Sequence, residues 1–408
     1  MSKHARRMVG AAAVAIVIGT GLPEVFALGF QNADQGAAAT AQGNAFIAQA
    51  DDATAVYYNP AGLTQIHGTE IDNGGDLVFP DEKLKDGGPS TKMYTVTLTP
   101  HLYSVTDFGM PKSPWRFGIG VNVPFGNEAE YAQNSPFSGS ITKANLQVIN
   151  IQPTVAYKFN DHFSLGAGLN VYDAYTALDS HVLAGPDPAH DHFHFDGNGV
   201  SVGAMAGLMW KITPQHTIGI VYHSPFTVNF RGNADVNIPG VIKQQNSAQA
   251  SLPLPQIIGA GYAFWPVPKL KLEADVDWTD WQPLNKLVLH AQGSQANGET
   301  IPFNWMASFM YEVGAQYQID KHWKVRAGYI FSEDSVPNGT FSPSVPDADR
   351  HVFSVGFGYT TGRYTLNALY QYTLAADRTL TTKNNGTAAD GTWLVSFNSV
   401  MVEMGMKF

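Results

Sequence analysis

Apolar and polar side chains alternate along most of this chain. From Leu270 to Trp278, apolar and charged residues trade places along nine positions, and from Trp323 to Phe331 the alternation continues with basic residues. Between Phe353 and Tyr359, small residues take the polar positions. Successive side chains of a β-strand point to opposite faces. Each segment therefore predicts a strand with one apolar and one polar face.

The same pattern predicts fourteen strands in all. We expect them to begin near Thr69, Lys92, Trp115, Asn145, Phe163, Val200, Thr217, Gln256, Lys269, Ser308, His322, His351, Arg363 and Trp393. Short turns alternate with long polar connections, the latter at 80–90, 127–142, 178–197, 232–253, 283–304, 332–350 and 375–391. An even strand number with short turns and long loops is typical of a bacterial outer-membrane barrel. A soluble sandwich has no reason to sort its loops in this way.

The carboxyl end of the chain supports a barrel. From Met401 to Phe408 the side chains alternate, and the sequence stops on an aromatic residue, which resembles the last strand of an outer-membrane barrel. We therefore assign Phe408 as an assembly signal for the barrel assembly machinery. The final strand of a soluble sandwich could look similar. Trp393 and Phe397 fall on the opposite face of the last expected strand from Val402. This predicts either a bulge near Ser399 or that the first part of this strand lies above the membrane.

The amino end reads as a secretory signal peptide, residues 1–27. Lys3, Arg6 and Arg7 precede an apolar run from Val9 to Ile18, and Ala27 supplies the small residue at the cleavage point. The run is too short for a helix that spans a bilayer, which needs about 20 residues. An amino-terminal anchor helix is the alternative, but glycines and a proline interrupt the segment where an anchor would continue.

Composition narrows the function further. Charged residues make up 14% of the chain, against a usual ~25%, while aromatic residues make up 12% and glycines number 40. These values suit strands that face lipid on one side and a lumen on the other. The chain has no cysteine, which excludes disulfides and thiolate metal sites. A net charge of −10 without a basic patch disfavours nucleic acid binding, and we expect no cofactor.

Residues 28–66 do not alternate. Gln35 to Gln49 is rich in alanine and predicts short helices, and Asn59-Pro60 marks a turn. The segment is too apolar for a flexible tail. We expect it to fold back as a plug inside a barrel that spans 67–408, with a periplasmic extension as the alternative.

These features together resemble the FadL family of outer-membrane transporters for long-chain fatty acids and hydrocarbons. The resemblance rests on Leu28-Gly29-Phe30-Gln31, Asp51-Asp52-Ala53, Asn59-Pro60-Ala61, the fourteen strands and Phe408. It implies a hatch inside a fourteen-strand barrel and capture of hydrophobic ligand by outer loops. It also implies transfer to an interior apolar pocket and sideways release through a gap at a kink in the third strand.

The expected third strand contains a physical cause for such a kink. It reads Phe117 to Gly126 and includes Pro124-Phe125-Gly126. Proline cannot donate to a strand ladder and glycine weakens a strand, so we expect a break there. The resemblance implies that Asn59-Pro60-Ala61 forms the hatch residues that face this kink.

Other candidate residues follow from the chemistry of a fatty acid. An inward arginine or lysine could hold its carboxylate, and the candidates are Arg116, Lys324 and Arg326. Exposed loop aromatics can form a landing site for its apolar tail; the candidates are Phe137, Phe193 and Phe195, with loop packing as the alternative. Trp115, Trp265, Trp278, Trp281 and Trp323 lie near strand ends, which predicts aromatic girdles at the membrane interfaces, with ligand stacking as the alternative.

Metal and catalytic sites receive no assignment. His181, His190, His192 and His194 cluster in one expected loop, where they could bind a divalent metal or serve only as polar loop residues. The sequence does not decide between these, and we assign no metal. Hydrolase elbows, phosphate loops and zinc-protease motifs are lacking. A barrel lipase would need a Ser–His pair on the lipid face, and no expected strand presents one, so we assign no catalytic residue.

The sequence therefore predicts a monomeric barrel in the bacterial outer membrane, surrounded by outer-membrane lipids. Its expected function is passive uptake of hydrophobic molecules, with long-chain fatty acids as the first choice. Aromatic or aliphatic hydrocarbons are the alternative substrates. A water-filled porin and a structural or adhesive barrel are the alternative functions.

Overall fold

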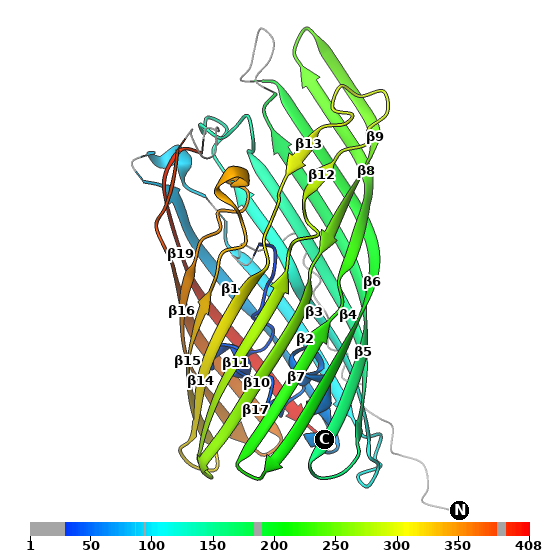
Figure 1. The fold of residues 1–408 in the computed structure, drawn as a ribbon, viewed down its shortest axis with the longest axis vertical. Coiled ribbons are helices and arrows are strands. Elements are labelled where there is room, and N and C mark those ends of the chain that lie inside the picture. The colour runs from blue at the N-terminus through cyan, green and yellow to red at the C-terminus, as the bar shows by residue number, and fades with distance from the viewer. Residues whose placement is uncertain (1–28, 86, 94, 183–189, 382–388) are drawn as a thin grey trace, which may run out of the picture.

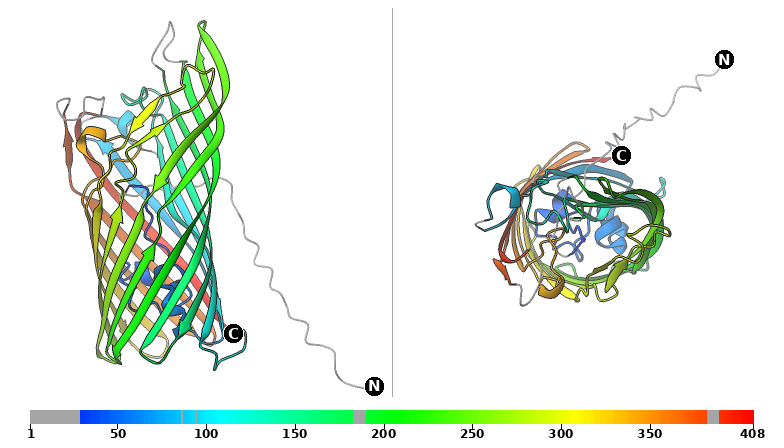
Figure 2. Two further views of the ribbon diagram at one scale, coloured as in Figure 1. Left: turned by 45° about the vertical axis from the view of Figure 1, so that its right-hand side comes forward. Right: turned by 90° about the horizontal axis from the view of Figure 1, so that it is seen from above.

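The computed structural model describes residues 29–408, apart from 86, 94, 183–189 and 382–388. These residues form a closed antiparallel barrel with a short-helix segment inside it, which Figure 2 shows from above. The expected signal peptide, residues 1–27, lies outside the described residues. Within the described part, no helix is long and apolar enough to cross a membrane.

The wall is a closed sheet of fourteen barrel strands, some of which are divided into two labelled segments. The strands of its first half are β1 (Thr69–Leu84), β2 (Thr97–Thr106), β3 (Trp115–Glu130), β4 (Lys143–Lys158), β5 (Phe163–Ser180), β6 (His192–Thr213), β7 (His216–His223), β8 (Phe226–Ile238), β9 (Ile242–Leu254) and β10 (Gln256–Val267). The others are β11 (Leu270–Asp280), β14 (Ser308–Gln318), β15 (Trp323–Ser332), β16 (Arg350–Thr361), β17 (Tyr364–Ala375), β18 (Arg378–Leu380) and β19 (Gly391–Lys407). β7 and β8 both pair with β6, so together they count as one barrel strand. In the same way β9 and β10 count as one strand, because they pair with β8 and β7, and β18 continues β17 along β19. β1 pairs with β19, which closes the barrel.

Short helices and a small hairpin complete the structure. The helices are α1 (Ala37–Thr40), α2 (Ala55–Tyr58), η1 (Pro60–Gln65), η2 (Pro89–Thr91) and η3 (Asn338–Thr340). β12 (Lys286–Val288) and β13 (Thr300–Pro302) pair at the outer end of the barrel, below the tips of β8 and β9 (Figure 1). The first two helices and η1 lie inside the lumen, so the predicted fold, a fourteen-strand barrel with an amino-terminal plug, is confirmed.

Two strand predictions were wrong at the outer end. β6 begins at His192 rather than near Val200, and residues 232–253, expected as a loop, form most of the β8–β9 hairpin. Figure 1 shows the strands of this region rising beyond the rest of the wall. Their outward residues are polar, but the inward ones, such as Val236 and Ile238, are buried and apolar. The sequence pattern is therefore still that of a strand, one that continues above the lipid.

The expected bulge near Ser399 was also wrong. The register of β19 against β1 is unbroken from Lys407 opposite Glu70 to Trp393 opposite Leu84. Trp393 and Phe397 point inward and are buried. The parity of the apolar residues changes because the inner face itself becomes apolar in the upper barrel.

Charged residues on β11 face the lumen, as their alternation predicted. Lys271, Glu273 and Asp275 are all buried. A charge on the lipid face would cost ~2–4 kcal/mol at the membrane midplane. Inside, these side chains hold the plug by its backbone, as the contacts of residues 45–49 show.

Carboxylates of the barrel wall bind the plug through hydrogen bonds to its backbone N–H groups. Asp275 accepts hydrogen bonds from the N–H groups of Phe46 (2.8 Å) and Ile47 (2.9 Å). Glu273 accepts from Ala48 (2.7 Å) and Gln49 (3.2 Å). In the same way, Glu403 of β19 accepts from Ala37 N–H, and Asp72 of β1 accepts from Ala53 N–H. We call residues 37–53 with these carboxylates the floor.

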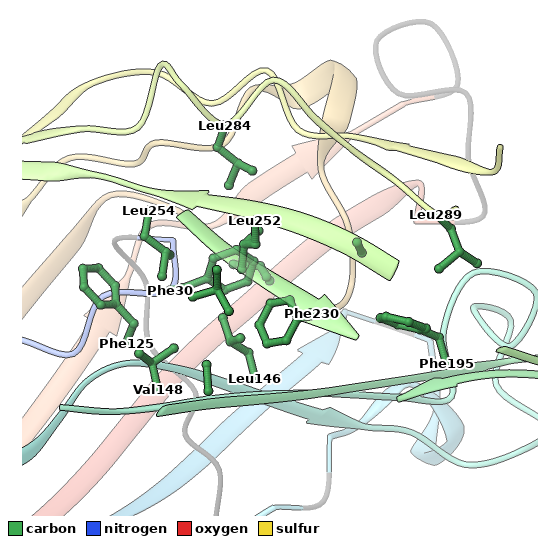
Figure 3. Close-up of a cluster of buried hydrophobic side chains, with 14 of the residues drawn as sticks. Phe30, Phe125, Leu146, Val148, Phe195, Phe230, Leu252, Leu254, Leu284 and Leu289 are labelled. Atoms are coloured by element: carbon green, nitrogen blue, oxygen red, sulfur yellow. The ribbon is translucent and has the colours of Figure 1, made fainter. Parts of the chain in front are cut away.

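Above the floor, the two largest apolar clusters of the lumen are separate from each other. The first cluster comes mainly from β4–β6, β8–β10 and the connection between β11 and β14; it includes Phe30, Phe125, Leu146, Val148, Phe195, Phe230, Leu252, Leu254, Leu284 and Leu289, labelled in Figure 3. The second cluster includes Val78, Tyr131, Phe137, Phe341, Trp393, Val395 and Phe397.

Candidate functional site

The wall is interrupted in its third strand. β2 and β3 pair only from Thr106 opposite Phe117 to Leu102 opposite Val121, so β3 beyond Val121 has no partner on β2. The register of β3 against β4 shifts between Asn122 and Phe125. Pro124 lies in this shift, where its missing N–H removes a ladder donor.

The start of the described chain fills the place beside the break. Asn32 N–H donates to Pro124 O (2.8 Å), and Gly126 N–H donates to Phe30 O (2.8 Å). Gln31 and Phe125 form an isolated antiparallel bridge. The side chain of Asn32 also donates to Val123 O (3.1 Å). A few bonds to residues 30–32, instead of a full strand ladder, therefore cover this part of β3.

Asn59-Pro60-Ala61 lies elsewhere, so its predicted position facing the Pro124 kink was wrong. Asn59 Nδ2 donates to Ile47 O (2.8 Å) and to Leu208 O of β6 (3.1 Å). A Cβ atom at Gly207 would collide with Asn59, and one at Gly166 would collide with Pro60. Two inward glycines on β5 and β6 thus create the space for the tripeptide. The contact of these two glycines with the tripeptide depends on the register of β5 and β6, which the local sequence does not show.

An outer cavity of about 480 Å³ opens at the extracellular end of the first cluster. Phe193 and Phe195 of β6 line it, as do Val236 and Leu289. Both phenylalanines were sequence-based candidates for a landing site, and the structure places them together in one cavity. They reach it from a strand rather than from the expected loop.

The first cluster runs from this cavity to the break in β3. Figure 3 shows Phe195 and Leu289 at one end, Phe125 and Phe30 at the other, and Phe230 between them. Phe195 and Leu289 also line the outer cavity, while Phe125 belongs to the register shift. One apolar lining therefore joins the outer cavity to the interrupted wall.

Aromatic rings close the inner end of the first cluster. Phe30 lies 4.8 Å from Trp305 and 6.0 Å from Trp281, measured between ring centroids. Trp281 in turn lies 6.2 Å from Phe125. Trp281 is completely buried, so its assignment to an aromatic girdle was wrong. The connection after β11 folds inward instead of staying at the interface, which alternation within the strands could not predict.

The three cations proposed for the ligand carboxylate have other partners or positions. Arg116 donates to Ile66 O (2.6 Å) and so fixes the end of the plug. Arg326 donates to Gln316 Oε1 (2.8 Å) and Asn367 Oδ1 (2.9 Å). Lys324 lies opposite Gln318, near the short turn between β14 and β15. None of the three lines the outer cavity or the interior cavity beside Arg350.

Arg350, a buried cation, was not among the candidates from the sequence. It lines an interior cavity of about 50 Å³ together with apolar residues that include Val78, Met310 and Phe397. Its guanidinium carbon lies 4.7 Å from the centroid of the Phe397 ring, and its Nε has no hydrogen-bond partner among the described residues. Arg350 is the first residue of β16 after a long connection. Its inward direction could be found only from the register of that strand.

Phe137 belongs to the second cluster instead of the outer cavity. Its ring centroid lies 5.1 Å from Trp393 and 5.4 Å from Tyr131. The Tyr131 hydroxyl donates to Pro343 O (2.9 Å). These contacts tie two outer connections together, which is the loop packing left open as an alternative for this residue.

The histidines near β5 and β6 pair with neighbouring carboxylates. His194 Nδ1 lies 2.6 Å from Asp179 Oδ1, and His181 Nδ1 lies 3.3 Å from Asp191 Oδ1. Among the described residues, no group of three or more His, Asp or Glu side chains is arranged to hold a metal ion. Part of the expected loop, residues 183–189, lies outside the described residues.

Comparisons with known proteins agree with this architecture. The model of the outer membrane transport protein family (OMPP1/FadL/TodX) matches residues 21–408. The chain is similar to an outer membrane protein of Neisseria meningitidis, 25% identical over 94% of each chain. It is also similar to the long-chain fatty acid transport protein of Salmonella typhi, 23% identical over 76% of this chain and 78% of the relative.

Solved structures share the fold. A FadL homologue of Pseudomonas aeruginosa superposes with a TM-score of 0.83 at 20% identity, covering 93% of this chain and all of that one (100%). The toluene transporter TbuX of Ralstonia pickettii superposes with a TM-score of 0.72 at 18% identity, covering 92% of this chain and 99% of that one.

Proposed function

From the premise that the chain belongs to the family of outer membrane transport proteins (OMPP1/FadL/TodX), we propose that it takes up long-chain fatty acids. The ligand enters the outer cavity at Phe193 and Phe195, passes along the first cluster, and leaves sideways through the break at Pro124-Phe125-Gly126. Transport is passive, because each step exchanges one apolar contact for another.

Family membership confirms the broader predictions. The protein is an outer-membrane β-barrel transporter for hydrophobic molecules, and the family consists of transporters, not enzymes. The choice between fatty acid and hydrocarbon belongs to our proposal. A monomeric state, contacts with outer-membrane lipids and the barrel assembly machinery, and the role of Phe408 as an assembly signal stay predictions.

The continuity of the first cluster carries the proposal. Buried apolar side chains form one continuous cluster from the outer cavity to the break in β3. A fatty acid gains about 0.8 kcal/mol for each CH₂ group removed from water. An apolar lining lets the hydrocarbon tail advance by small steps, since each CH₂ group exchanges one apolar contact for a similar one.

The weak closure at β3 supports lateral release. Backbone bonds to Phe30 and Asn32 cover the strand there, whereas a regular ladder would require β2. The ligand also prefers a bilayer to water. Downward release would have to displace the floor, which several wall carboxylates hold by backbone hydrogen bonds. The same floor argues against a water-filled porin.

A reversible lock tests this exit. The chain has no cysteine. Gln31→Cys with Phe125→Cys therefore gives one cysteine pair at the bridge beside the break, which can form a disulfide on oxidation. Asn233→Cys with Ser247→Cys, a pair in the β8–β9 hairpin, is the matched control. Uptake of radiolabelled hexadecanoic acid is measured in cells with equal surface levels of each variant, before and after reduction.

We expect the oxidised lock at 31 and 125 to stop uptake and reduction to restore it, with no such change for the control pair. Unchanged uptake through a fully oxidised lock would contradict lateral release and favour an axial route. Uptake of toluene or hexadecane, but not of hexadecanoic acid, would favour the hydrocarbon alternative. Large ion currents through the purified wild-type protein would favour a porin, and binding of a partner protein without any uptake would favour an adhesive barrel.

A further inference from the structure

Trp281 occupies the inner end of the first cluster, where the apolar lining meets the break in β3. Its ring lies within 6.2 Å of both Phe30 and Phe125, measured between ring centroids. Phe30 comes from the segment that covers the break, and Phe125 comes from the break itself. A molecule that moves from the outer cavity to this exit therefore passes the indole ring.

The indole N–H of Trp281 has no hydrogen-bond partner among the described residues, although the side chain is completely buried. Trp393, at the same depth of burial in the second cluster, differs in this respect. Its Nε1 donates to Ala389 O at 2.9 Å. Buried indole groups normally find an acceptor.

A buried donor without an acceptor destabilises the folded protein, and a phenylalanine at this position would avoid that cost. Buried unpaired groups of this kind call for an explanation, and a transported acceptor supplies one. We propose that the Trp281 N–H binds the polar head of the transported molecule. This inference rests on the proposed function and narrows its substrate class.

The preferred substrates are then long apolar chains with one hydrogen-bond acceptor at the end, such as a carboxylate or hydroxyl. Pure hydrocarbons are accepted less well, because they leave the donor unpaired. A site that expects a hydrogen bond discriminates against an analogue that lacks it. Trp281 is a specificity-determining residue in this account, and Arg350 is not needed for the step because it lines a different cavity.

Three probes of equal chain length test the inference: radiolabelled hexadecanoic acid, 1-hexadecanol and hexadecane. Uptake is compared in cells that carry the wild type, Trp281→Phe or Trp393→Phe at equal surface levels. Trp281→Phe keeps an aromatic ring and removes the donor. Trp393→Phe removes a paired donor from the second cluster and is the matched control.

For Trp281→Phe we expect uptake of the acid and the alcohol to fall about tenfold relative to hexadecane. For Trp393→Phe the ratios should stay at the wild-type values. Equal losses for all three probes, or no loss, would overturn the inference while leaving the proposed function intact. A wild-type protein that moves none of the probes would instead overturn the proposed function.

A second measurement covers the case that Trp281→Phe does not assemble. The protein has eight tryptophans, so wild-type protein with ¹⁵N-labelled indole gives few N–H resonances in lipid nanodiscs. Substitution of the other tryptophans one at a time assigns the Trp281 signal. We expect it to move downfield with hexadecanoic acid or hexadecanol and not with hexadecane. A signal that ignores all three ligands would overturn the inference.

Discussion

In the lower barrel, wall carboxylates hold the backbone of the floor, whereas in the upper barrel the same inward rows of the strands carry apolar side chains. β19 illustrates the change, because Glu403 binds Ala37 N–H below while Phe397 and Trp393 join the second cluster above. Backbone hydrogen bonds fix the floor in one place. Contacts in the upper lumen are non-directional and can be exchanged for a ligand. The barrel is therefore closed where it is polar and passable where it is apolar.

The largest effect should come from breaking the floor. Asp275→Ala leaves the N–H groups of Phe46 and Ile47 without their acceptor. Each unpaired buried group costs about 1–3 kcal/mol, so we expect the floor to loosen and ions to pass. Single-channel recordings in planar bilayers should show open steps that the wild type lacks.

Asp235→Ala is the control for the floor, since Asp235 lies in the outer β8–β9 hairpin. Its recordings should match those of the wild type. Closed recordings for Asp275→Ala would mean that the wall carboxylates are not what holds the floor in place.

The contrast between the two apolar clusters can be sharpened by one polar substitution in each. Phe230→Asn places an amide in the middle of the first cluster, and burial of an unpaired amide costs about 1–3 kcal/mol. We expect roughly tenfold slower uptake of hexadecanoic acid for each assembled barrel. Phe137→Asn makes the same change in the second cluster and should lower the melting temperature without slowing uptake.

Heat-modifiability on gels gives the amount of assembled barrel, and uptake is divided by it. Equal losses of uptake for Phe230→Asn and Phe137→Asn would contradict the proposal that the ligand moves along the first cluster and not along the second.

The smallest effect is expected at Arg350, which lines the interior cavity outside the first cluster. Arg350→Gln removes a cation from a cavity that no residue of the first cluster lines. The concentration of hexadecanoic acid for half-maximal uptake should therefore stay at the wild-type value, and a rise of about fivefold, the equivalent of about 1 kcal/mol, would place the carboxylate beside Arg350. Uptake of hexadecanol, which has no charge, should stay unchanged and serves as the internal control. A loss of both substrates would indicate a structural role beside Phe397 instead.

The sequence predicted the wall better than its contents. Alternation gave the strands from Thr69 onward and the inward direction of Glu273 and Asp275, because a period of two depends only on neighbouring residues. The sequence also contains the motifs that resemble the family. The position of Asn59-Pro60-Ala61 escaped prediction, because it depends on glycines in β5 and β6, about 100 to 150 residues further along the chain.

Residues in long connections were the hardest to place. Trp281 was assigned to a girdle from its distance to a strand end, yet the connection after β11 folds into the lumen and buries it. Arg350 follows another long connection, and its direction depends on where β16 begins. Local pattern does not say whether a connection turns into the barrel or away from it, because that choice depends on packing with distant strands.

The central claim is that ligand moves along the first cluster to the break in β3. Crystals of the protein soaked with 16-bromohexadecanoic acid test it most directly, because the bromine atom marks the ligand by anomalous scattering. The account predicts bromine peaks within the first cluster, between Phe195 and Phe125, and none in the second cluster. Peaks confined to the second cluster, or along the plug toward the periplasmic turns, would contradict it.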